Sequence, residues 1–252
     1  MIQRGPEPPR PHVVEPKLGK QVHGEVTIAR TFGSTGDLSS GFWRIGPTSP
    51  GAQADGSHKL TYSAPLGDET ACVVDGTAVL TVTSTAKTYK GLEVRWEIDA
   101  PFFKKYRVTW NGTDATPEPP VDLQINHVSD NTEEWTDHHF TEPKEGPQDF
   151  IRMGGSTGTH FSGGWRSGKG IAATNLDDKG SLTTPYTGTL GDEMILLLEG
   201  EVDVTETETG NKHSFRAGDA IGLTSGMHIT WISKGPYTKK LWVITRDKIP
   251  EA

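Results

Sequence analysis

The chain has 252 residues, a formal net charge of −8 and one cysteine, Cys72. The acidic balance disfavours nucleic acid and anionic membrane surfaces as partners, and a single cysteine excludes an internal disulfide bond. No apolar stretch approaches the roughly 18 residues of a transmembrane helix, and residues 1–20 lack the apolar segment of a secretion signal, so a cytoplasmic location is expected.

Residues 1–22 are rich in proline and lack periodicity, which predicts an arm outside the folded body. Short runs rich in β-branched and aromatic residues follow, separated by glycine and aspartate, as is typical of strands. The clearest of them are Thr77–Thr83, Glu93–Ile98, Arg107–Trp110, Met194–Leu198, Val202–Thr207, Ile229–Ser233 and Leu241–Thr245. Residues 209–212 favour a hairpin turn between two such runs. The pattern predicts an all-β chain, either a sandwich or a barrel.

The chain also repeats itself. The segment Gly33-Ser34-Thr35-Gly36 returns 122 positions later as Gly155-Ser156-Thr157-Gly158. Further matched pairs are Trp43-Arg44 with Trp165-Arg166, Tyr62 with Tyr186, Asp68-Glu69 with Asp192-Glu193, Gly76 with Gly200, Trp96 with Trp231, and Lys104-Lys105 with Lys239-Lys240. A unit of this length is a whole domain, because solenoid repeats span about 20–50 residues. We therefore expect two domains, at residues 23–111 and 151–252, joined by a connector at 112–150 that is rich in proline, aspartate and glutamate.

The two copies differ in length. The matched glycines Gly76 and Gly200 are 124 positions apart, whereas the matched tryptophans Trp96 and Trp231 are 135 positions apart. The first copy therefore lacks 11 residues between these two points. The lost stretch corresponds to a turn and one strand, which should leave an open sheet edge or a shortened hairpin in the first copy. For this reason we place the functional site in the second copy.

The second copy resembles the cupin superfamily. The resemblance rests on Glu193 and Gly200, followed by Arg216-Ala217-Gly218-Asp219 and by residues 224–228. The Gly-Trp-Arg segment ending at Arg166 and the Trp231 region look more specifically like the ethanolamine-utilisation-type cupins, in which the metal histidines are often missing. The resemblance implies two tandem jelly-roll β-barrels in one chain, a bicupin, with a small-molecule ligand and a possible homodimer.

The metal motif of the cupins is absent here. With one motif spacing its first two histidines would fall at Thr187 and Thr189, and with the other at Tyr186 and Gly188. The third would fall at Ile229, and the adjacent His228 is one residue out of phase, which on a strand turns a side chain to the opposite face. Only Glu193 remains at a ligand position, and one carboxylate does not hold a transition metal. We therefore predict no metal and no cofactor.

Glu193 is the candidate proton-transfer group, because a carboxylate inside an apolar barrel is costly unless it is paired or used. The alternative is an ion pair with Arg166, Lys239 or Lys240, or a strand-end position in solvent. Further catalytic candidates are Tyr186, as a donor to a developing oxyanion, and His228, as a proton shuttle, with rim and exposed-strand positions as their alternatives. Candidate substrate-binding residues are Trp165, Arg166, Thr187, Thr189, Trp231 and Lys240. Trp165 could equally be a core aromatic residue, and Trp231 should point inward.

These features favour a protein that binds a small organic molecule, aromatic or polyketide-like, in the second barrel. Any catalysis would be non-redox acid–base chemistry, such as isomerisation, cyclisation or elimination. One alternative is a metal-dependent dioxygenase or lyase, which would need His228 or His160 beside Glu193. Another is a non-enzymatic structural or regulatory bicupin whose interior is filled by side chains.

Overall fold

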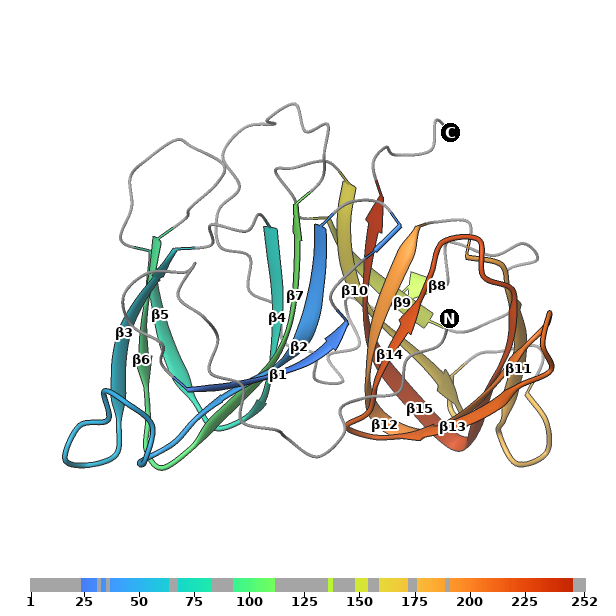
Figure 1. Ribbon diagram of the computed structural model, residues 1–252. Helices are drawn as coiled ribbons and strands as arrows, with labels where there is room; N and C mark the ends of the chain where they lie inside the picture. The colour runs from blue at the N-terminus through green and yellow to red at the C-terminus, as the bar shows by residue number, and fades with distance from the viewer. Residues whose placement is uncertain are drawn as a thin grey trace.

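The computed structural model describes residues 24–30, 33–34, 37–63, 68–82, 93–111, 136–137, 148–153, 159–171, 176–188 and 191–246. All regular elements in these ranges are strands, which confirms the all-β prediction. The N-terminal arm and most of the expected connector lie outside the described residues. The described residues fall into an N-terminal unit and a C-terminal unit, which we define as residues 24–111 and 136–246 (Figure 1).

The N-terminal unit contains two antiparallel sheets. Its strands are β1 (Glu25–Arg30), β2 (Asp37–Ile45), β3 (His58–Ser63), β4 (Asp68–Asp75), β5 (Ala78–Val82), β6 (Glu93–Ile98) and β7 (Phe103–Asn111). One sheet has the order β1-β2-β7-β4 and the other has the order β3-β6-β5.

The C-terminal unit is built around two long strands. Its strands are β8 (Thr136–Asp137), β9 (Gln148–Met153), β10 (Thr159–Gly168), β11 (Leu182–Tyr186), β12 (Asp192–Glu206), β13 (Lys212–Arg216), β14 (Ala220–Leu223) and β15 (Ile229–Arg246). The first part of β12 pairs with β14 and with the end of β15, whereas its second part pairs with β13 and with the start of β15. Register shifts near Glu199 separate the two parts, so one strand takes part in two sets of pairings within a single sheet. The turn predicted at residues 209–212 connects β12 to β13, with Gly210 at φ 71°.

The duplication seen in the sequence extends to strand register. Trp43 lies opposite Lys105 on neighbouring strands, and Trp165 lies opposite Lys240 in the same way. Because residues paired across a sheet share a face, matched sequence positions in the two units are also matched positions in space.

The shorter first copy has two sheet edges that the second copy covers. Strands β13 and β14 flank β12, but β4 and β5 each end a sheet among the described residues. Val73 on β4 is 51% exposed and Val79 on β5 is 60% exposed. This agrees with the open edge expected from the 11 missing residues.

The two units pack against each other through a mixed apolar core. Along β12, Met194 and Leu196 face the N-terminal unit, where they join Phe42 and Tyr106, while the alternating Ile195 faces the interior of its own unit. The β1-β2-β7-β4 sheet therefore lies between the interior of the N-terminal unit and the C-terminal unit (Figure 1). Each unit keeps its own interior on the far side of this interface.

Candidate functional site

A buried ion pair lies inside the C-terminal unit. Glu193 is 3% exposed, and Lys240 Nζ donates a hydrogen bond to its Oε1 over 2.9 Å. The two residues come from the adjacent strands β12 and β15. Of the three cations considered as partners from the sequence, Lys240 is the one that binds Glu193, and Lys239 pairs instead with Glu199 at 3.3 Å.

Two tryptophans flank the lysine of this pair. Lys240 Nζ lies 4.6 Å from the ring centroid of Trp231 and 5.5 Å from that of Trp165. The two indoles meet edge to face, with their centroids 6.4 Å apart. Trp231 points inward, as the sequence predicted, and both rings also belong to the buried core of the unit. Cation–π attraction therefore holds the ammonium group against an aromatic wall.

Tyr186 completes the cluster from β11. Its hydroxyl is buried beside the Glu193 carboxylate and makes no well-aligned hydrogen bond among the described residues. Burial raises the pKa of Tyr186 well above its ordinary value, and the negative charge of Glu193 raises it further. The tyrosine is thus a neutral hydroxyl that can donate a hydrogen bond into the interior.

The five matching residues of the first copy meet in the same way in the N-terminal unit. Lys105 Nζ lies 2.6 Å from Glu69 Oε1, and the Tyr62 hydroxyl donates to Glu69 Oε2 over 2.9 Å. Lys105 Nζ is 4.3 Å from the ring centroid of Trp96 and 5.7 Å from that of Trp43. Sequence analysis singled out only the second copy, although the matched Tyr, Glu, Lys and Trp positions of the repeat already carried this signal.

Other residues proposed from the sequence lie apart from this cluster or outside the described residues. His228 and Thr187 are exposed, and Thr189 is outside the described residues. Arg166 follows Trp165 directly on β10, so its side chain leaves the opposite face of the strand. The core of the predicted site in the structure is therefore Glu193, Lys240, Tyr186 and the two tryptophans.

The donor set of the metal-dependent alternative is not assembled in the part of the chain that the structure describes. No group of three or more His, Cys, Asp or Glu side chains there could hold a metal ion. His160 lies opposite Thr245 on β15, whereas Glu193 lies opposite the next residue, Ile244, so the two side chains face different sides of the sheet. The Nε2 atom of His160 is instead 2.6 Å from Thr70 Oγ1 in the N-terminal unit.

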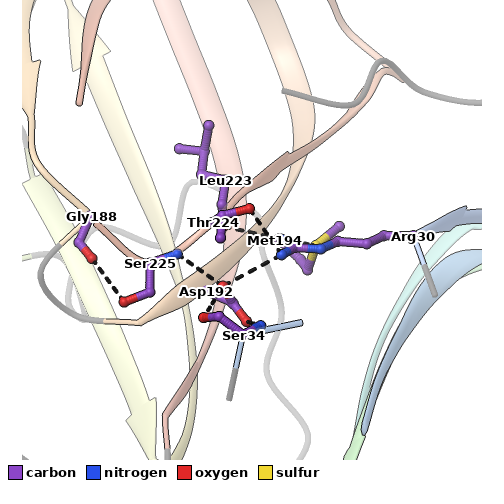
Figure 2. A network of polar contacts seen from close by, with 8 residues as sticks. All are labelled: Arg30, Ser34, Gly188, Asp192, Met194, Leu223, Thr224 and Ser225. Atoms are coloured by element: carbon purple, nitrogen blue, oxygen red, sulfur yellow. Dashed lines mark hydrogen bonds and ion pairs between the residues drawn. The ribbon is translucent and has the colours of Figure 1, made fainter. Parts of the chain in front are cut away.

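The residue before Glu193 ties the two units together. Asp192 is fully buried, and its carboxylate forms an ion pair with Arg30 of β1 at 3.4 Å. The same carboxylate accepts hydrogen bonds from the backbone N–H and the hydroxyl of Ser34 (Figure 2). Asp192 also accepts a hydrogen bond from the backbone of Ser225, while Arg30 donates to the carbonyl of Leu223. Because β12 alternates, one strand presents Asp192 to the neighbouring unit and Glu193 to its own interior. No single sequence motif pointed to this network.

Comparison with known proteins supports the resemblance of the second copy to the cupin superfamily. Residues 183–241, which include Tyr186, Glu193, Trp231 and Lys240, match the family described as EutQ-like cupin domain. No curated protein matches the chain.

Solved structures share the fold at low sequence identity. A Pseudomonas syringae pv. tomato protein of unknown function from the DUF861 family superposes with a TM-score of 0.55 at 14% identity, covering 97% of this chain and 99% of its own. A mutant of oxalate decarboxylase from Bacillus subtilis superposes with a TM-score of 0.55 at 12% identity, covering 98% of this chain and 77% of its own. The chain thus shares its all-β fold with these proteins along nearly its full length.

Among the described residues, no helix is long and apolar enough to cross a membrane.

Proposed function

We propose that this chain is a bicupin whose C-terminal jelly-roll barrel binds a small organic molecule around Glu193 and Lys240. Two matched units in one chain, each with its own buried core, support the bicupin organisation. The cupin-domain match over residues 183–241 supports the placement of the ligand in the second unit.

The observation that carries this proposal is the largely buried Glu193–Lys240 pair beside the Tyr186 hydroxyl, which makes no well-aligned hydrogen bond among the described residues. A buried ion pair commonly adds little stability, and a buried hydroxyl without a partner costs free energy. Such a combination is explained by a ligand that accepts the tyrosine hydrogen bond and uses the charges. The indoles of Trp165 and Trp231 suit a planar or aromatic ligand.

The same arrangement suits proton transfer without a redox step. Glu193 would remove a proton from a bound molecule, and the negative charge that develops would be stabilised by the Lys240 ammonium and the Tyr186 hydroxyl. In an isomerisation the bond to hydrogen breaks, its electron pair moves within the ligand, and the proton returns at another atom. In a cyclisation the electron pair instead forms a ring bond to an electrophilic atom of the ligand, which takes up the proton, and in an elimination it forms a double bond and expels a leaving group that takes the proton.

Tyr186→Phe tests the binding proposal with little risk to folding, because the lost hydroxyl makes no well-aligned hydrogen bond among the described residues. Untagged protein would be examined by native mass spectrometry for a retained small molecule, and the released compound would be identified after denaturation. We expect the wild type and the matched control Tyr62→Phe to retain the molecule and Tyr186→Phe to lose it. Equal retention by all three proteins, or none by the wild type, would overturn the proposal.

A structural or regulatory bicupin is the second candidate, and the packed interior of the C-terminal unit favours it. That interior contains a continuous cluster of buried side chains that includes Leu197, Phe215 and Trp242. On this interpretation the Glu193–Lys240 ion pair would serve only to fix how the strands of the interior pack together. Glu193→Gln would then leave every activity of the protein unchanged, whereas an acid–base enzyme would lose turnover while keeping its ligand.

A further inference from the structure

The charged cluster of the N-terminal unit differs from its counterpart by one residue with a large effect on charge. Arg107 occupies the position on β7 that Trp242 occupies on β15: each lies opposite a glycine of the neighbouring strand, Gly41 or Gly163. The N-terminal cluster therefore combines one carboxylate with two cations, whereas the C-terminal cluster has one of each.

Arg107 faces the interior together with Lys105. The two residues are separated by one position on β7, so their side chains leave the same face. The positive charge of Arg107 also acts on both Glu69 and Tyr62. Burial raises the pKa of Glu69, but the charges of Lys105 and Arg107 outweigh burial and hold that pKa below its usual value. Glu69 therefore stays ionised at neutral pH, and the cluster keeps an excess positive charge.

The guanidinium of Arg107 has unused hydrogen-bonding capacity. Lys105 and Tyr62 are already bonded to Glu69, but Arg107 makes no side-chain hydrogen bond or ion pair with the described residues although it is half-buried. A planar guanidinium with free donors matches the two oxygens of a carboxylate.

The surroundings of Glu69 are also more polar than those of Glu193. Thr109 lies opposite Glu69 across the sheet, where Ile244 lies opposite Glu193. On the next strand Ser39 takes the place of Phe161. The strands that supply Phe215, Ile221 and Leu223 to the C-terminal core have no counterpart among the described residues of the N-terminal unit. Smaller and more polar side chains thus surround the N-terminal charges.

We infer that the N-terminal unit contains a second ligand site, which binds a small aromatic or planar carboxylate through Arg107 and Lys105. The ligand carboxylate supplies the negative charge that balances the second cation, and Trp43 and Trp96 provide the aromatic wall beside it. The site does not depend on the ligand proposed for the C-terminal barrel.

Binding of 4-fluorobenzoate to the full chain, followed by fluorine NMR, tests this inference. The neutral isostere 4-fluorobenzamide is the control ligand. We expect the benzoate to bind and the benzamide not to bind, because only the former carries the charge. Arg107→Gln should weaken benzoate binding by about tenfold or more, the usual effect of losing a charge-assisted hydrogen bond. The benzoate affinity of Arg107→Lys should lie between those of the wild type and Arg107→Gln, because lysine keeps the charge but lacks the planar guanidinium.

Two further variants separate recognition from folding. Glu69→Gln removes the carboxylate that competes for both cations, and should strengthen benzoate binding by about threefold or more. If Glu69 had only a structural role, its replacement would not increase the affinity for benzoate. Lys104→Gln makes the same charge change as Arg107→Gln on the opposite face of β7 and should leave binding unchanged.

The inference fails if the benzoate and the benzamide bind equally, if neither binds at millimolar concentration, or if Arg107→Gln binds like the wild type. Benzoate binding that is lost in Tyr186→Phe and retained in Arg107→Gln would place the ligand in the C-terminal barrel. That result would overturn this inference and leave the proposed function intact.

Discussion

The two copies of the Glu–Lys pair show how the same strand register can create two different electrostatic environments. In the C-terminal unit the pair is enclosed by aromatic and aliphatic side chains, and Glu193 is 3% exposed. In the N-terminal unit Glu69 has three polar neighbours, since Lys105 and Tyr62 bond to it and Arg107 adds a second positive charge. The register fixes which charges meet, but the neighbouring strands decide how strongly each charge depends on its partner.

Removing the lysine from each pair should give the largest difference between the two units. Lys240→Met leaves Glu193 buried without its cation, and we expect the free energy of unfolding to fall by about 3–5 kcal/mol. Lys105→Met should cost less, about 1–2 kcal/mol, because Arg107 and Tyr62 still stabilise Glu69. Urea denaturation of both variants measures the difference.

The double variant Lys240→Met/Glu193→Leu is the control for that experiment. Replacing both charges by apolar groups should restore most of the lost stability. Equal costs for the two single lysine variants would show that the surroundings of the pairs do not matter.

The buried histidine at the interface between the units, His160, should make the free energy of unfolding depend on pH more strongly than the charged groups in either interior. Burial lowers the pKa of His160 from 6.5 to about 4, although the nearby charge of Asp68 opposes this change. Below pH 6.5 the unfolded chain therefore binds a proton that the folded chain rejects, so stability falls as the pH is lowered from 6.5 toward 4. The full loss is about 3 kcal/mol.

Chemical denaturation between pH 7 and pH 4 would measure this effect. His160→Gln keeps a polar group of similar size and should remove this part of the pH dependence. If the wild type and His160→Gln have parallel profiles, His160 is not the group responsible.

Asp192→Asn separates the interface from the adjacent interior position. We expect a loss of about 2 kcal/mol, because the amide keeps the shape of the carboxylate but loses its charge toward Arg30. Ligand retention in the C-terminal unit should persist, since Glu193 faces the other way. Thermal unfolding together with native mass spectrometry would test both statements, and loss of ligand with unchanged stability would contradict them.

The cation–π contribution of the aromatic walls should be the smallest of these effects. Trp165→Leu and Trp43→Leu each remove one ring from beside the lysine of a charged pair, at 5.5 Å and 5.7 Å. The cation–π contribution is about 1 kcal/mol in each unit, in addition to lost packing. The packing loss should be larger for Trp165, which belongs to the larger core cluster. Denaturation of the two variants side by side gives the comparison, and a greater loss for Trp43→Leu would contradict it.

Several features of this protein could be determined from its sequence alone. Strand runs and the internal repeat predicted an all-β chain with two matched units, because alternation and turn residues are local properties that packing did not override. The resemblance to cupins placed Glu193, Lys240, Tyr186, Trp165 and Trp231 among the candidate residues, and the structure brings these five together.

Other features depended on the tertiary structure. Which of Arg166, Lys239 and Lys240 pairs with Glu193 was decided by strand register, because β10, β12 and β15 each place only alternate residues on the interior face. The Asp192–Arg30 contact and the burial of His160 arise where two distant sheets pack together. The second charged cluster became visible because the fold keeps the register of the first copy despite its 11 missing residues. Sequence specifies the side chains and their local alternation, but contacts between distant strands exist only once the chain has folded.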